Sequence, residues 1–165
     1  MSDTYTLIPS PIGELLLAGA RGRLRELSFR GEGAMHGPAR IDPRWRRDED
    51  AFPEVRAQLR EYFAGARREF EVELELLGSE WERRVWDALL GIAYGETRSY
   101  GQVAAQLGSP GAARAVGLAN GRNPVAVIVP CHRVIGAGGR LTGYGGGLQR
   151  KRMLLDLESG RPALI

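Results

Sequence analysis

The chain has 165 residues, of which 43% are hydrophobic and 26% are charged, a composition typical of a folded globular protein. A single cysteine excludes an intramolecular disulfide, and one cysteine with two histidines is too few for a zinc site of the finger type. No apolar run approaches the ~18 residues that cross a membrane, and the residues before Leu7 lack the basic charge of a signal peptide. We therefore expect a soluble, cytoplasmic protein of one or two domains, without a metal or a membrane partner.

The net charge of +3 is distributed unevenly along the chain. Residues 1–78 contain 12 basic and 14 acidic residues, a net charge of −2, whereas residues 79–165 contain 11 and 6, a net charge of +5. No acidic residue lies between Glu96 and Asp156. Such a bias is typical of proteins that bind phosphate groups, although charge alone fits a basic surface without a partner equally well.

The first part of the chain is typical of short strands with one helix. Apolar spacing after Pro53 predicts a helix that continues to Phe63. Strict alternation over 70–76 predicts a half-buried strand whose row of glutamates is solvated rather than bound to a metal. Turn signals separate the earlier apolar runs, and Arg21-Gly22-Arg23 predicts a hairpin. The remaining predictions are strands at 5–8, 14–18 and 24–29, and a loop at 31–50.

The pattern changes near residue 78, where a capping box at Ser79 and Glu82 predicts the start of a helix. We therefore divide the chain into a strand-rich N-terminal domain, 1–78, and a C-terminal domain, 79–165. Short helices at 99–107 and 112–120, joined by a turn containing glycine, predict a helix-turn-helix, although many helical hairpins have the same pattern.

The β-branched run 125–129 predicts a buried strand that leads to Cys131, and apolar residues predict a closing helix over 149–158. The expected fold class is α/β, in the α+β sense. A small N-terminal antiparallel sheet with a helix is followed by a mostly helical C-terminal domain. This second domain contains the helix-turn-helix and a short active-site strand.

Cys131 is a candidate nucleophile because it follows this apolar run and precedes His132 and Arg133. A thiol with the ordinary pKa of ~8.5 is mostly protonated at neutral pH, and a neighbouring imidazole can accept its proton. A third polar group, for which Glu158 is a candidate, can orient the imidazole. The alternative is an inert buried cysteine.

The glycine-rich residues 143–147 lack the features of a phosphate-binding loop. We interpret them either as a mobile wall around a flat ligand or as a flexible surface loop.

Residues 130–134, Pro-Cys-His-Arg-Val, with Asn123-Pro124 before them, resemble the signature of the O6-alkylguanine-DNA alkyltransferases, or methylated-DNA–protein-cysteine methyltransferases. Over 1–78 the resemblance is limited to size and a strand-rich start with one helix. Further similar stretches follow in order through most of the second half, at 98–102, 112–117, 142–144 and 154–158.

This resemblance implies a protein that removes the alkyl group from O6-alkylguanine, and from O4-alkylthymine, in double-stranded DNA. The group would pass to Cys131 once per molecule, without a cofactor, after the base is flipped out of the helix. The resemblance implies that His132 acts as a base through a water and that Glu158 orients it. It also implies that Asn123 holds the turn before the active-site strand. The expected protein is a monomer, and cooperative binding on DNA is left open.

The family's recognition helix corresponds to 112–120 and enters the minor groove. Arg114 would fill the space left by the flipped base, and Tyr100 would press on the adjacent phosphate. Some members have a serine where this chain has Gly145, and some have a bulky apolar residue where it has Asn120. The resemblance implies that the chemistry is unaffected by these two departures and leaves the contacts to the base at both positions open. The expected DNA-binding residues are Tyr100, Arg114, Ala115, Gly117 and Asn120, and the expected pocket residues are Tyr144, Gly145 and Val134.

Two other classes of function remain open at this point. A non-catalytic relative would bind alkylated DNA and recruit other factors, but such proteins lack the acceptor that Cys131 provides. An unrelated Cys-His hydrolase would use the same two side chains and turn over repeatedly.

Overall fold

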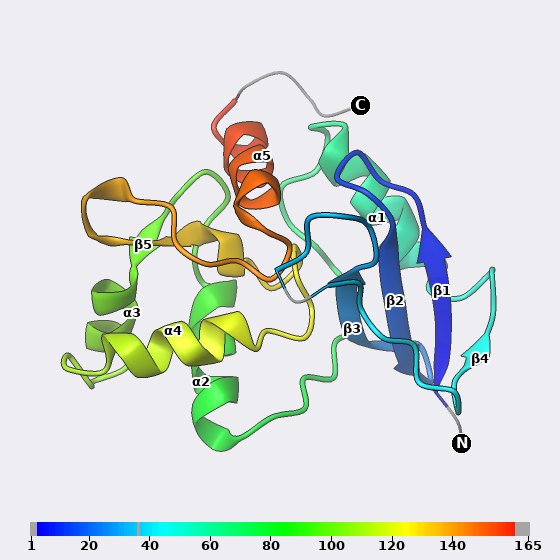
Figure 1. The fold of residues 1–165 in the computed structure, drawn as a ribbon, viewed down its shortest axis with the longest axis horizontal. Coiled ribbons are helices and arrows are strands. Elements are labelled where there is room, and N and C mark those ends of the chain that lie inside the picture. The colour runs from blue at the N-terminus through cyan, green and yellow to red at the C-terminus, as the bar shows by residue number, and fades with distance from the viewer. Residues whose placement is uncertain (1–2, 36, 161–165) are drawn as a thin grey trace.

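The computed structural model describes residues 3–35 and 37–160. A sheet and helix α1 form one side of the molecule, helices α2, α3 and α4 form the other, and α5 lies between them (Figure 1). The expected fold class is confirmed, with a small sheet in the N-terminal part and helices in the C-terminal part. No helix in the described part of the chain is both long enough and apolar enough to span a membrane.

The N-terminal sheet has the strand order β3-β2-β1-β4. Strands β1 to β3 pair antiparallel, as predicted, and β4 adds parallel to β1. In the tight β2–β3 turn, Arg21 and Gly22 have φ angles of 56° and 77°, the left-handed values that a two-residue hairpin turn requires. The strands are β1 (Thr4–Ile8), β2 (Leu15–Ala20), β3 (Arg23–Phe29) and β4 (Arg46–Arg47).

Helix α1 (Pro53–Phe63) begins at the predicted proline and buries Val55 and Leu59. In the C-terminal part, Ser79 and Ser99 each form a complete capping box, which explains where α2 and α3 begin. The predicted helix pair and closing helix are confirmed. The elements are α2 (Glu80–Leu90), β5 (Arg98–Ser99), α3 (Tyr100–Gln106), α4 (Ala113–Gly121), η1 (Cys131–Arg133), β6 (Val134–Ile135), η2 (Ala137–Gly139) and α5 (Leu148–Glu158).

Two strand predictions are wrong. Segment 70–76 pairs with the outer edge of β3 only through one bridge, Leu24 to Leu74, because residues 124–126 occupy the same edge at Leu27. Residues 125–129 form a buried turn in which only Val125 bridges to the sheet, at Leu27. Their β-branched composition reflects burial rather than strand pairing. The only strand beside Cys131 in the described chain is β6, which follows it and pairs parallel with β5. The predicted loop 31–50 also contains the short strand β4.

Candidate active site

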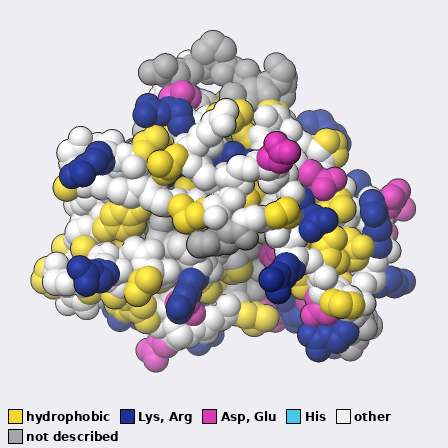
Figure 2. Space-filling model, in the orientation of Figure 1, with side chains coloured by type: hydrophobic (Ala, Val, Ile, Leu, Met, Phe, Trp, Pro, Cys, Tyr) yellow, Lys and Arg dark blue, Asp and Glu magenta, His cyan; other side chains and the backbone are white. Residues whose placement is uncertain are grey.

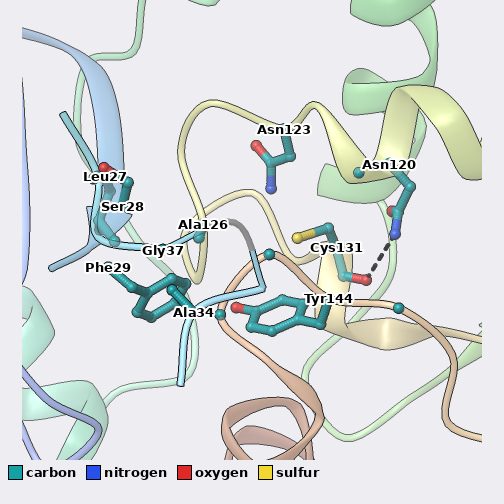
Figure 3. A pocket seen from close by; sticks show the side chains of 15 residues that line it. Leu27, Ser28, Phe29, Ala34, Gly37, Asn120, Asn123, Ala126, Cys131 and Tyr144 are labelled. Carbon is teal, nitrogen blue, oxygen red and sulfur yellow. Dashed lines mark hydrogen bonds between the residues drawn. The ribbon is translucent and has the colours of Figure 1, made fainter. Parts of the chain in front are cut away.

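A cavity of about 170 Å³ opens beside Cys131 and is lined by both parts of the chain. Phe29 and Ala34 contribute from the N-terminal part, and Asn120, Asn123 and Tyr144 from the C-terminal part. Figure 3 shows the Cys131 sulfur between the Asn123 side chain and the Tyr144 ring, at the edge of this space. The thiol is thus buried but borders a cavity that a small or flat group can enter.

Asn123 holds the turn that leads to Cys131. Its Oδ1 accepts from the Val125 amide at 3.0 Å, and its Nδ2 donates to the Val129 carbonyl at 2.7 Å. Within this turn Val127 has a φ of 71°, a left-handed conformation that is unfavourable for a β-branched residue. Asn123 therefore closes a strained turn by bonding both ends of it, in the arrangement expected for this residue.

Behind Cys131, Glu158 accepts hydrogen bonds from three buried side chains. His132 Nε2 lies 2.8 Å from Oε2, and the Tyr62 hydroxyl donates to the same oxygen at 2.6 Å. Arg133 Nε donates to Oε1 at 2.7 Å, and Nη2 donates to Oε2 at 2.9 Å. The predicted neighbours Cys131, His132 and Glu158 are thus brought together, although they come from η1 and the end of α5.

The charges in this cluster fix the state of the imidazole. Burial raises the pKa of Glu158, but the bonds from His132 and Arg133 outweigh it and lower the pKa to about 2. Burial lowers the pKa of His132 despite the carboxylate beside it, so the ring is neutral at pH 7. An ionised carboxylate can only accept, so Nε2 carries the proton. His132 Nδ1, buried and without a partner in the described chain, is then a free base.

Burial raises the pKa of the Cys131 thiol to about 11, although Asn123 and the charge of Lys151 both oppose this rise. Lys151 is itself fully buried, and its Nζ donates to the carbonyls of Val134 at 2.7 Å and Thr142 at 3.0 Å. Burial lowers the pKa of Lys151 to about 8. At neutral pH the thiol is therefore protonated, and it needs a base before it can act as a nucleophile.

The glycine-rich residues 143–147 form a packed wall of the cavity. Tyr144 is buried against Phe29, with 5.8 Å between the ring centroids. The Met35 amide donates to the Gly145 carbonyl, and Arg150 bridges the carbonyls of Gly146 and Ile12. The N-terminal part therefore fixes the position of this wall, which the sequence left open between a ligand wall and a flexible surface loop.

Helices α3 and α4 present most of the expected DNA-binding residues at the surface. Arg114 is exposed, and Ala115 and Gly117 are partly exposed on the same helix. Tyr100 begins α3, and its hydroxyl bonds the Thr142 hydroxyl at 2.5 Å. On the face seen in Figure 2, positive side chains outnumber negative ones over these helices, whereas both signs are mixed over the sheet.

Two expected site residues occupy different positions. Asn120 was grouped with the DNA-binding surface, but it is buried, lines the cavity and donates from Nδ2 to the Cys131 carbonyl at 3.3 Å. Val134 was grouped with the pocket, but it is fully buried in β6, and its carbonyl accepts from Lys151. Gly145 and Tyr144 do line the cavity.

Sequence reasoning missed Tyr62, Arg133 and Lys151 as parts of the site. Arg133 directly follows Cys131 and His132 in the sequence, and this adjacency was the available signal that Arg133 belongs to the site. Tyr62 lies 96 positions before Glu158, and nothing in the local pattern links them.

In the part of the chain that the structure describes, no group of three or more His, Cys, Asp or Glu residues could hold a metal ion. The chemistry that the site offers is that of a thiol with a nearby neutral base.

Comparisons with known proteins agree with this site. Residues 4–76 match the family model of the 6-O-methylguanine DNA methyltransferase ribonuclease-like domain, and residues 80–160 match that of its DNA binding domain. The chain therefore belongs to the O6-alkylguanine-DNA alkyltransferase, or methylated-DNA–protein-cysteine methyltransferase, family.

Named relatives cover nearly the whole chain. The methylated-DNA–protein-cysteine methyltransferase of Mycobacterium tuberculosis is 57% identical over 157 residues, which are 95% of this chain and 93% of the relative. That of Methanosarcina acetivorans is 50% identical and covers 93% of this chain and 97% of the relative. The crystal structure of Mycobacterium tuberculosis OGT in complex with DNA superposes with a TM-score of 0.90 at 55% identity, over 98% of this chain and 96% of that one.

Proposed function

We propose that this protein repairs double-stranded DNA by transferring the alkyl group of O6-alkylguanine to Cys131, as a methylated-DNA–protein-cysteine methyltransferase. The observation that carries the proposal is the buried Cys131 thiol, which borders a cavity and whose neighbour in the sequence, His132, bonds Glu158. Family membership and the DNA bound in the Mycobacterium tuberculosis structure support the substrate. The exposed Arg114 and the positive face around α3 and α4 support the DNA partner.

His132 Nδ1 accepts the thiol proton through a water, and Glu158 keeps the imidazole in the tautomer that leaves this nitrogen free. The Cys131 sulfur forms a bond to the alkyl carbon, and the bond between that carbon and guanine O6 breaks. The electron pair stays on the base, and the proton returns from the imidazolium to give guanine. The products are an S-alkylcysteine and an unmodified base.

The alkyl group lies inside the base stack, so the nucleotide leaves the helix before it reacts. Flipping costs a few kcal/mol and is least costly for a weakened base pair. In this proposal Arg114, exposed on α4, fills the vacated space, and Tyr100 presses on the neighbouring phosphate. Tyr144 and Gly145 wall the base pocket. O4-alkylthymine, which carries the same kind of ether, is a second substrate.

The reaction occurs once per molecule, because a thioether is a poor leaving group and no second step restores the thiol. Incubation with O6-benzylguanine, followed by mass spectrometry, tests the proposal. A covalent benzyl group on Cys131, with one product molecule per protein, supports it. Binding without modification indicates a non-catalytic binder of alkylated DNA, and repeated turnover indicates a hydrolase.

The cytoplasmic location of the protein stays a prediction, and cell fractionation tests it.

A further inference from the structure

Tyr62 connects the carboxylate of Glu158 to helix α1. Its side chain is fully buried, and its hydroxyl donates to Oε2 at 2.6 Å. The other side chains that bond this carboxylate, His132 and Arg133, are adjacent residues of the short helix η1. Among the described contacts, Tyr62 therefore supplies the hydrogen bond that ties Glu158 to a second element of the fold, the last turn of α1.

The hydroxyl of Tyr62 stays protonated near neutral pH and acts as a donor. Burial and the negative charge of Glu158 raise the pKa of Tyr62 well above its ordinary value of 10. An ionised carboxylate can only accept, so the phenol proton points at Oε2. The ring packs against Phe63 and Phe70, each with 5.3 Å between the ring centroids. Packing therefore fixes the direction in which the hydroxyl donates.

The position of Glu158 decides which nitrogen of His132 carries the proton. The carboxylate favours the tautomer with the proton on Nε2, which leaves Nδ1 as the base. If the carboxylate moved away from Nε2, the proton could occupy either nitrogen, and the fraction of the active tautomer would fall. Tyr62 does not line the cavity beside Cys131, so loss of its hydroxyl should leave binding of the base unchanged.

We propose that Tyr62 is a positioning residue for the transfer reaction, because its hydroxyl holds Glu158 against His132 and so keeps Nδ1 free to accept the thiol proton. This inference rests on the proposed function and adds to it a residue from the N-terminal part of the chain. Tyr62 acts on the chemical step through Glu158 and touches neither the thiol nor the base.

Tyr62→Phe tests the proposal, since it removes the hydroxyl and keeps the ring. Tyr94→Phe is the matched control. The ring of Tyr94 packs against that of Tyr62, with 6.2 Å between the centroids, but its hydroxyl bonds the Leu157 carbonyl instead of Glu158. Alkylation of Cys131 in the full chain is followed under single-turnover conditions over a range of O6-benzylguanine concentrations. All rates are measured below the thermal melting transition of each variant.

Tyr62→Phe should lower the maximal rate about fivefold, the effect of one hydrogen bond, and leave the half-saturating concentration within about twofold. Tyr94→Phe should change neither quantity. A hydroxyl that contributes only to stability would leave both quantities unchanged in folded Tyr62→Phe, and that result would overturn the proposal.

A double-mutant cycle shows whether Tyr62 acts through Glu158. Tyr62→Phe is combined with Glu158→Gln, in which the carboxylate is already lost. The hydroxyl should then change the maximal rate less than about twofold. The same loss of about fivefold in both backgrounds would show that Tyr62 acts independently of Glu158, and the proposal would be wrong.

The 15N chemical shifts of the His132 imidazole provide a readout that does not depend on activity. The sequence contains two histidines, so the signals are few. The wild type and Tyr94→Phe should carry the proton on Nε2, and Tyr62→Phe should show a mixture of the two tautomers. An unchanged tautomer in Tyr62→Phe would contradict the proposal. A wild type with the proton on Nε2 that does not alkylate Cys131 would instead contradict the proposed function itself.

Discussion

His132 Nε2 lies 2.8 Å from Glu158 Oε2, and this contact joins the short helix η1 to the last turn of α5. Both side chains are buried, and Arg133 neutralises the carboxylate. Glu158 therefore serves to fix the proton on Nε2 more than to stabilise a charged imidazole. The free Nδ1 is the atom on which the proposed proton transfer depends.

Replacement of Glu158 by glutamine tests this contact. Glutamine can donate to Nε2 and so favours the tautomer with a protonated Nδ1, which cannot act as a base. We expect Glu158→Gln to slow alkylation at least about tenfold, with little change in duplex affinity. Loss of the negative charge should also lower the pKa of His132, so the midpoint at which the rate rises with pH should move downward. Single-turnover alkylation across pH measures both effects, and superimposable profiles would remove Glu158 from the site.

The same carboxylate should make stability depend on pH in acid. The folded-state pKa of Glu158 is about 2, below its ordinary value of 4.5, so its contribution is complete above pH 4.5. The contribution is lost as the pH falls from about 4.5 to about 2, and amounts to about 3 kcal/mol. The unfolding free energy of the wild type and Glu158→Gln, measured by urea denaturation, should converge over this range. A difference that is constant with pH would show that Glu158 has an ordinary pKa.

The charge of Lys151 should assist the thiol. Lys151 opposes the rise in the pKa of Cys131 and holds the carbonyls of Val134 and Thr142. Lys151→Met keeps the volume and removes the charge that Lys151 carries at pH 7, so alkylation at pH 7 should slow several-fold. Single-turnover alkylation at pH 7 measures this rate. Arg152→Met, at the exposed neighbouring position, is the control and should leave the rate unchanged.

Arg114 should matter for duplex DNA and not for the chemical step. The side chain is exposed on α4, has no bond to the buried His132–Glu158 pair among the described contacts, and is proposed to fill the space of the flipped base. We expect Arg114→Ala to slow repair of alkylated duplex about tenfold or more, and reaction with free O6-benzylguanine less than twofold. Arg122→Ala, an exposed arginine at the end of the same helix, controls for lost positive charge. Equal losses on the two substrates would contradict the assigned role.

The periodicity of apolar residues predicts the helices, and the capping boxes at Ser79 and Ser99 mark where α2 and α3 begin. Both signals are local in the sequence, so no tertiary contact is needed to find them. It failed at 125–129, where burial favours β-branched residues whether or not the backbone is extended. The turn there depends on Asn123, which bonds both ends of the segment, and on one bridge to Leu27. These contacts cannot be read from local composition. The division into domains at residue 78 stays a prediction.

The site was partly predictable for a similar reason. Cys131 and His132 are adjacent in the sequence, and Glu158 follows from the family resemblance. Tyr62 and Lys151 join the site only through packing of distant segments, so no local pattern marks them. The family resemblance places Asn120 among the DNA-binding residues, whereas in the structure Asn120 is buried in the last turn of α4 and donates to the Cys131 carbonyl.

Transfer of the alkyl group to Cys131 is the central claim, and one measurement tests it most directly. Duplex DNA with O6-methylguanine carrying a labelled methyl group is incubated with the wild type, Cys131→Ser and Cys131→Ala, and the label is located by peptide mass spectrometry. The wild type should carry one methyl group on Cys131. Both variants should carry none, yet melt and bind duplex like the wild type, because the thiol is a small buried group. Full residual transfer by either variant would contradict the account.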